Sequence, residues 1–295
     1  MKEIDYLPIE EKSINDRLIN LYGTHLVGLY SEMEKIYHDP IYDIKPAAPL
    51  LIELSDDEDK YPYESAELRV MVFGRENNNW NDKGNRGNAE IYTQYSTYNF
   101  HLENTEDILT EIRGKHTDDS ENELLPEQEM YGLTDIYHDY CFEETGVAKN
   151  QFTKRMYQFI EMLEQKTGKQ VGCVWNNLFK IGRGKVGFGG CCAQSPDYIK
   201  DIEKRTFDVI GKEIEILKPD IIIFMTGIEV DDAIVEKLNL PSGEFPIIDA
   251  SLPHLRKVVI PGVKYAARTI HPSRKSNEIF NKYCAALIED IIQNI

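Results

Sequence analysis

The sequence of 295 residues has few cysteines and no long apolar stretch. Its five cysteines include no C-x-x-C pair, which argues against a disulfide framework, a zinc ribbon and an iron–sulfur cluster. No run of about 18 apolar residues is present, so we expect no membrane span. Residues 1–5 are acidic and lack the apolar centre of a secretory signal, so a cytoplasmic location is expected.

Basic residues are also scarce, since 33 Lys and Arg face 51 Asp and Glu, for a net charge of -18. Proteins that bind nucleic acid are usually basic, because phosphate contacts supply most of their non-specific affinity. The acidic residues, however, are concentrated in residues 1–67 and 100–147. Residues 256–275 contain six basic side chains and no acidic one. One interpretation of this uneven distribution is a locally positive field around residues 256–275. The alternative is chance clustering on a generally acidic surface.

Apolar periodicity predicts alternating helices and strands along the chain. Helices are expected at residues 10–37, 149–166, 197–217, 229–238 and 276–293, and strands at residues 68–73, 171–179, 220–225, 256–260 and 264–270. This alternation predicts a three-layer α/β/α fold with a short central parallel sheet. We expect a single domain over 1–295, with a helical N-terminal extension (1–67) and an acidic, partly helical insertion (82–165).

Four apolar runs end in glycine, asparagine or histidine. They are VMVFGREN (70–77), VWNNLFK (174–180), DIIIFMTG (220–227) and TIHPSR (269–274). In an open parallel α/β sheet, ligands bind at the carboxyl ends of the strands. The polar residues after these runs therefore predict a ligand site at that edge.

In this order the four segments resemble the uracil-DNA glycosylase superfamily. The resemblance covers about half of the chain, residues 68–80 and 170–290. It implies hydrolysis of the N-glycosidic bond of uracil or another altered base, as in base-excision DNA repair. It also implies DNA, single-stranded or damaged, or a nucleotide as the partner, and no metal or organic cofactor.

The first segment contributes Gly74, Glu76 and Trp80 to the expected site. In the superfamily, a polar residue two positions after the glycine acts on the attacking water, and Glu76 occupies that position here. A carboxylate there also stabilises the positive charge that develops on the sugar. Trp80 is expected to stack on a base. The alternatives are a solvated turn for Glu76 and a core or rim position for Trp80.

The second segment contributes the residue that reads the base. An Asn amide offers both a donor and an acceptor, which suits the edge of uracil. Asn177 fits the resemblance best and Asn176 is the alternative. Neighbours on a strand face opposite sides, so only one of the two can point into the site. The glycine-rich stretch that follows carries Arg183 and Lys185, which we expect to contact phosphate.

The last segment, His271-Pro272-Ser273, is the most specific. In the superfamily the histidine stabilises the departing base anion. Ser273 and Arg274 are expected to hold phosphate. Arg274 stands where several members have an apolar wedge, and this difference favours a single-stranded substrate or plain phosphate binding over base flipping from a duplex.

Two other functions remain open. A glycosylase-like domain that binds a nucleotide or nucleic acid without cleaving it is favoured by the glutamate at position 76 and the missing wedge. The second is a protein-interaction module that uses the acidic insertion (82–165) as its binding surface. The sequence has no metal-ligand spacing, and the base and the oligomeric state stay undetermined.

Overall fold

The computed structural model has an α/β fold. The residues that it describes are 13–54, 61–78, 102, 104–114, 132–141, 151–183, 195–241, 245–272 and 275–295. The chain forms two compact units. Unit 1 comprises Met1–Glu53, Glu76–Tyr140 and Phe179–Val209, and unit 2 comprises Leu54–Arg75, Cys141–Leu178 and Ile210–Ile295. Each unit combines segments distant in sequence, and the predicted organisation as one domain with an extension and an insertion stays a prediction.

The described elements follow the expected alternation of helices and strands. The helices are α1 (Ile14–His38), α2 (Thr105–Arg113), α3 (Leu133–Cys141), α4 (Gln151–Thr167), α5 (Asp197–Thr206), α6 (Ile210–Leu217), the 3-10 turn η2 (Ile228–Val230), α7 (Asp231–Lys237) and α8 (Asn277–Asn294). The strands are β1 (Pro46–Pro49), β2 (Leu68–Asn78), β3 (Val171–Arg183), β4 (Ile221–Phe224), β5 (Arg256–Val258) and β6 (Tyr265–Arg268).

The strands form one sheet in the order β1-β3-β2-β4-β6-β5. β2, β4 and β6 are parallel, with Phe73, Phe224 and Arg268 in register. The sheet is mixed, because β5 pairs antiparallel with β6 and β1 pairs antiparallel with β3. The prediction of a parallel centre is therefore confirmed, and the antiparallel edges were not anticipated.

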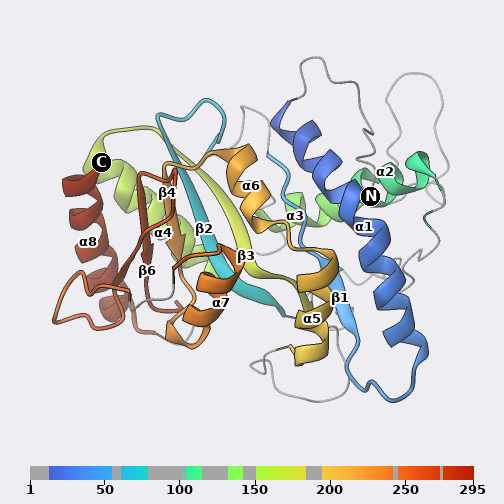
Figure 1. Cartoon of the computed structure of the whole chain (residues 1–295). Coiled ribbons are helices and arrows are strands. Elements are labelled where there is room, and N and C mark those ends of the chain that lie inside the picture. Colours follow the sequence, from blue (N-terminus) through green and yellow to red (C-terminus); the bar gives the residue numbers. More distant parts are fainter. Residues whose placement is uncertain are drawn as a thin grey trace. The chain divides into compact units, whose positions relative to one another are not determined.

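Side chains of the unit 2 strands alternate between two faces, as a pleated strand requires. Val70, Val72, Ile221 and Ile223 belong to one apolar cluster with side chains of α4 and α8. Figure 1 shows these two helices together on one side of the strands. On the opposite face, Phe73 and Phe224 stack with 4.9 Å between ring centroids, and α6 provides a hydrogen-bond partner for β3.

The strand order reverses at β2. The next strand in the sequence, β3, lies on one side of β2 within the sheet. The strand after it, β4, lies on the other side of β2. The carboxyl ends of β2 and β4 therefore flank the topological switch point, where open α/β sheets bind ligands.

Unit 1 is built around α1, which begins with a capping box between Ser13 and Asp16. The buried Tyr22 of α1 accepts a hydrogen bond at its hydroxyl from the backbone N–H of Ile52. The prolines at both ends of β1 are compatible with a strand at the edge of the sheet. The chain there is extended, and it pairs with Ile181 and Arg183.

The helix expected at residues 197–217 is two helices, and that prediction was wrong. Phe207 leaves helical geometry with φ -140° and ψ 40°. Its ring is fully buried and stacks on Tyr22. The break coincides with the passage of the chain from unit 1 to unit 2 at Ile210. Apolar periodicity continues through the break, so the sequence pattern gave no sign of it.

Candidate functional site at the carboxyl edge of unit 2

The carboxyl ends of the parallel strands bring together residues from separate motifs. Gly74 follows the paired part of β2, Thr226 and Gly227 follow β4, and His271 follows β6. Asn177 lies in β3, beside β2 in the sheet. All of these residues belong to unit 2. We refer to this group as the edge site.

Gly74 lies directly against Asn177. A Cβ atom at Gly74 would meet Asn177 Oδ1 at 2.5 Å, and Phe152 Cζ and Trp175 Nε1 at 3.3 Å each. Real Cβ contacts are essentially never as short as the first of these distances. The glycine therefore allows an amide, a phenyl ring and an indole to converge on one backbone position.

The two neighbouring asparagines of β3 have different surroundings. Asn176 is fully buried and donates from Nδ2 to Glu213 Oε2 of α6 at 2.8 Å. Asn177 is 1% exposed and carries its Oδ1 toward Gly74. Strand alternation thus places Asn177 on the side of the edge site, in line with the sequence-based preference. Its role in reading a base stays a prediction.

Phe152 of α4 is a member of the site that sequence reasoning did not include. Its ring lies 5.9 Å from that of His271 and 6.2 Å from that of Trp175, centroid to centroid. The apolar spacing of α4 explains its burial, which leaves it 9% exposed. Its place at the first turn of the helix was the available signal, because a first-turn residue can face a strand end.

The imidazole of His271 is largely desolvated. Burial, and next the charge of Arg75, lower the pKa of His271 while Glu229 opposes part of the effect, and the net result is a pKa of about 4. Lys275 adds a smaller contribution that also lowers it. His271 is therefore neutral near pH 7, where a neutral imidazole can donate a hydrogen bond to an oxygen that gains negative charge.

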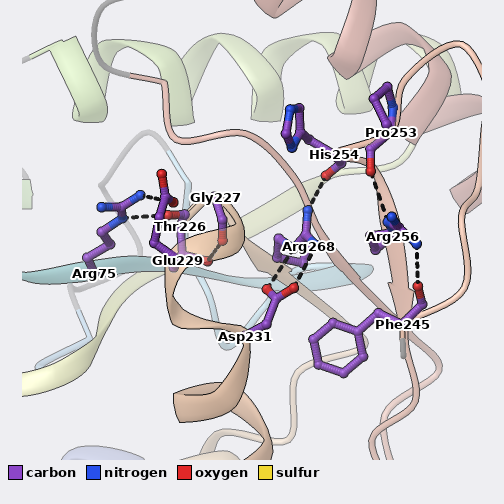
Figure 2. A network of polar contacts seen from close by, with 10 residues as sticks. All are labelled: Arg75, Thr226, Gly227, Glu229, Asp231, Phe245, Pro253, His254, Arg256 and Arg268. Carbon is purple, nitrogen blue, oxygen red and sulfur yellow. Dashed lines mark hydrogen bonds and ion pairs between the residues drawn. The ribbon is translucent and has the colours of Figure 1, made fainter. Parts of the chain in front are cut away.

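Arg75 extends from the end of β2 over the end of β4. Its Nε donates to the backbone carbonyl of Thr226, and its Nη2 pairs with Glu229 Oε2 (Figure 2). Gly227 lies between Thr226 and Glu229 in the sequence and has a φ of +73°, a backbone conformation that residues other than glycine rarely adopt. The local chain geometry therefore holds the guanidinium at the switch point, and sequence reasoning had not included Arg75.

A second polar network fixes the chain beside the edge site. The guanidinium of Arg268 binds both carboxylate oxygens of Asp231, with distances of 2.8 and 2.7 Å, and donates to the backbone carbonyl of His254 (Figure 2). The Arg268 side chain is 3% exposed. This bidentate pair joins β6 to the start of α7, and its role is structural.

Glu76 and Arg183 lie in unit 1 and not in unit 2. The Glu76 carboxylate accepts hydrogen bonds from the backbone N–H of Ser195, at 3.1 Å, and from its hydroxyl. Arg183 is buried at the end of β3, opposite Pro46 of β1. The roles predicted for both stay predictions.

The remaining predicted site residues are Trp80, Lys185, Ser273 and Arg274, and they lie outside the described residues. Within the described ranges, no group of three or more His, Cys, Asp and Glu side chains has the arrangement of a metal site. In the same ranges, no helix has the length and apolar character that crossing a membrane requires.

Comparison with protein-family models and with curated protein sequences finds no match for this chain. The chemistry of the site therefore rests on its own geometry. The edge site combines an amide, two aromatic rings, a neutral imidazole and a fixed guanidinium. This set suits a flat, polar ring that carries or develops negative charge.

Proposed function

We propose that the edge site binds a nucleobase and that the protein hydrolyses the N-glycosidic bond of uracil or another altered base in DNA. The observation that supports this proposal most strongly is the convergence of Asn177 and Phe152 on Gly74, with the His271 ring 5.9 Å from the Phe152 ring. Each of the three offers one interaction that a flat base needs: a paired donor and acceptor, a stacking surface and a donor for an edge oxygen.

In this proposal the bond between the sugar and the base nitrogen breaks, and the base leaves with the bonding electrons. Water adds its hydroxyl to the anomeric carbon, and its remaining proton neutralises the base. His271 donates to the base oxygen on which charge accumulates. A neutral imidazole serves this purpose because its hydrogen bond strengthens as the charge develops. Asn177 selects the base by its donor and acceptor pattern.

DNA as the substrate requires positive charge near the site despite the net charge of -18. Residues 256–275 supply six basic side chains and no acidic one within unit 2. Arg268 among them is committed to Asp231, so fewer than six can serve DNA. If phosphate contacts contribute, the affinity for an oligonucleotide falls steeply as salt is added.

Binding without cleavage is the second candidate, and the contacts of Glu76 favour it. The carboxylate that the resemblance assigns to water or to the sugar cation is engaged by the N–H and hydroxyl of Ser195. A carboxylate that accepts these bonds holds the adjoining backbone, and it has fewer lone pairs for a water. A base-binding protein retains the edge site without needing Glu76.

A cleavage assay separates the two candidates. Single- and double-stranded oligonucleotides that carry uracil or one of a panel of damaged bases are incubated with the protein, and abasic sites are revealed by strand scission in alkali. His271→Ala is expected to lower turnover by about 10²-fold or more. His254→Ala is the matched control, because His254 is exposed and only its backbone carbonyl is used by Arg268.

The outcomes are distinct. Scission by the wild type and by His254→Ala, but not by His271→Ala, supports the glycosylase. Equal scission by all three proteins contradicts the assignment of His271. No scission, with salt-sensitive binding of the oligonucleotides, supports the second candidate.

A further inference from the structure

Arg75 carries a permanent positive charge beside His271. Its guanidinium is anchored through Nε on the Thr226 carbonyl and through Nη2 on Glu229. Among the described residues, Nη1 has no hydrogen-bond acceptor, and Figure 2 shows one nitrogen of Arg75 turned away from both partners. The side chain is 27% exposed, so this end of the guanidinium is available to a ligand.

The position of Gly227 relates Arg75 to His271. A Cβ atom at Gly227 would lie 3.0 Å from Arg75 Nη2 and 3.7 Å from the backbone nitrogen of His271. The guanidinium of Arg75 and the backbone of His271 therefore lie within 4 Å of one point at the end of β4, and the charge of Arg75 is felt at the imidazole, whose pKa it lowers. The backbone N–H of Gly227 donates to Thr269 at 3.0 Å, which fixes this chain segment against the segment that leads to His271.

Glu229 is the only described carboxylate that pairs with Arg75, and its side chain is 57% exposed. An ion pair this open to solvent contributes little to stability. Its carboxylate is also free to turn into solvent when another anion approaches. Glu229 thus occupies, in the unliganded protein, a position that an anionic oxygen of a ligand can take.

We propose that Arg75 makes the edge site selective for a base that is anionic at the edge facing His271, with Glu229 as an internal competitor for the same guanidinium. This inference rests on the proposed base binding and adds to it a preference of the edge site for a negatively charged base. His271 donates a hydrogen bond as a neutral group, and Arg75 supplies the compensating charge. The site then binds the ionised form of a base more tightly than its neutral form, and an acidic base is the better leaving group.

The test uses two free bases of nearly equal shape, uracil and 6-azauracil. The additional ring nitrogen makes 6-azauracil more acidic, so at mildly alkaline pH it is largely ionised while uracil stays neutral. Isothermal titration calorimetry measures both affinities for each variant. The wild type is expected to prefer 6-azauracil by about tenfold, equivalent to about 1.4 kcal/mol, because a hydrogen bond between charged groups is stronger than a neutral one.

The variants change the charge at one position each. Arg75→Gln is expected to remove the preference, and Arg75→Lys to retain part of it. Glu229→Gln is expected to increase the preference several-fold, since the competitor is neutralised. Lys212→Gln is the matched control, because Lys212 forms an exposed ion pair with Glu215 in the same unit and should leave the preference unchanged.

Each outcome decides. A preference that survives in Arg75→Gln overturns the inference. So does equal binding of the two bases by the wild type, although base binding itself then stands. If neither base binds to the wild type, both the inference and the proposed function fail. If thermal unfolding shows that Arg75→Gln does not fold, Glu229→Gln decides alone: a stronger preference supports the inference and an unchanged one overturns it.

Discussion

Replacing Gly74 by alanine adds a methyl group against the side chain that we assign to base recognition. The new Cβ lies 2.5 Å from Asn177 Oδ1, whereas ordinary contacts begin at 3.4 Å. The amide must therefore move by about 1 Å. Phe152 and Trp175 have atoms at 3.3 Å from the same point, so neighbouring rings limit the directions in which the strain can relax.

The cost of this change follows from overpacking of a buried position. Inserting one methyl group into a well-packed core destabilises a protein by about 1–3 kcal/mol. A displacement of about 1 Å in a positioned group lowers function by about 10²-fold. We therefore expect Gly74→Ala to lose about 10²-fold in base affinity, equivalent to about 2.7 kcal/mol, beside a stability loss of about 1–3 kcal/mol. Urea denaturation measures the free energy of unfolding, and calorimetry with uracil measures the affinity.

Two further variants make the result specific. In Gly74→Ala combined with Asn177→Ala, the clash is removed with the amide. The two effects on stability should then fall short of additivity by about 1 kcal/mol or more. Gly211→Ala is the control, because a Cβ there meets nothing within 4 Å and Gly211 lies in α6 of the same unit. Additive effects of the first two substitutions, or uracil affinity unchanged in Gly74→Ala, would refute the reasoning.

Three shorter predictions concern stability. Arg268→Met leaves Asp231 without its bidentate partner and should lower the free energy of unfolding by about 3 kcal/mol in urea denaturation; a loss below about 1 kcal/mol would contradict this. Since the pKa of His271 is lowered from 6.5 to about 4, only the unfolded chain takes up this proton between those pH values, so stability falls as the pH falls. His271→Asn should reduce this fall in the free energy of unfolding by at most about 3 kcal/mol. A variant whose stability depends on pH as the wild type's does would contradict the prediction. Tyr22→Phe leaves the buried N–H of Ile52 without its acceptor and should cost about 1–3 kcal/mol, whereas a neutral effect in thermal unfolding would count against it.

The centre of the sheet could be predicted from sequence because buried parallel strands are short, continuous apolar runs. The runs at 70–73 and 221–224 pair in register as expected of such strands. The switch point follows from the same pattern, since polar residues stand where each run ends. The edge strand β1 was not predicted, because PAAP is too short to show a period. Strand β5 lies within the strand expected at residues 256–260, and only its antiparallel pairing was not predicted.

Parts of the site depend on tertiary contacts that no local pattern contains. Strand alternation sufficed to predict that Asn176 and Asn177 face opposite sides of the sheet, because it depends only on whether residues are an odd or even number of positions apart. Phe152 reaches the site through the packing of α4, and an apolar helix position looks the same whether or not it borders a ligand. Arg75 reaches the end of β4, where a Cβ at Gly227 would lie 3.0 Å from its Nη2, and sequence does not reveal this approach. The bonds between Glu76 and Ser195 join residues 119 positions apart.

The central claim is that Asn177 reads the edge of a base at the edge site. The most direct measurement is a titration of the isotope-labelled protein with uracil, followed through the side-chain amide signals of Asn177 and Asn176 by nuclear magnetic resonance. Asn176 serves as an internal reference, because its amide is bonded to Glu213 on the opposite face of the sheet. We predict that the Asn177 signal shifts in a saturable manner while the Asn176 signal stays in place. Saturable uracil binding that leaves the Asn177 signal unchanged, or the absence of binding, would contradict the claim.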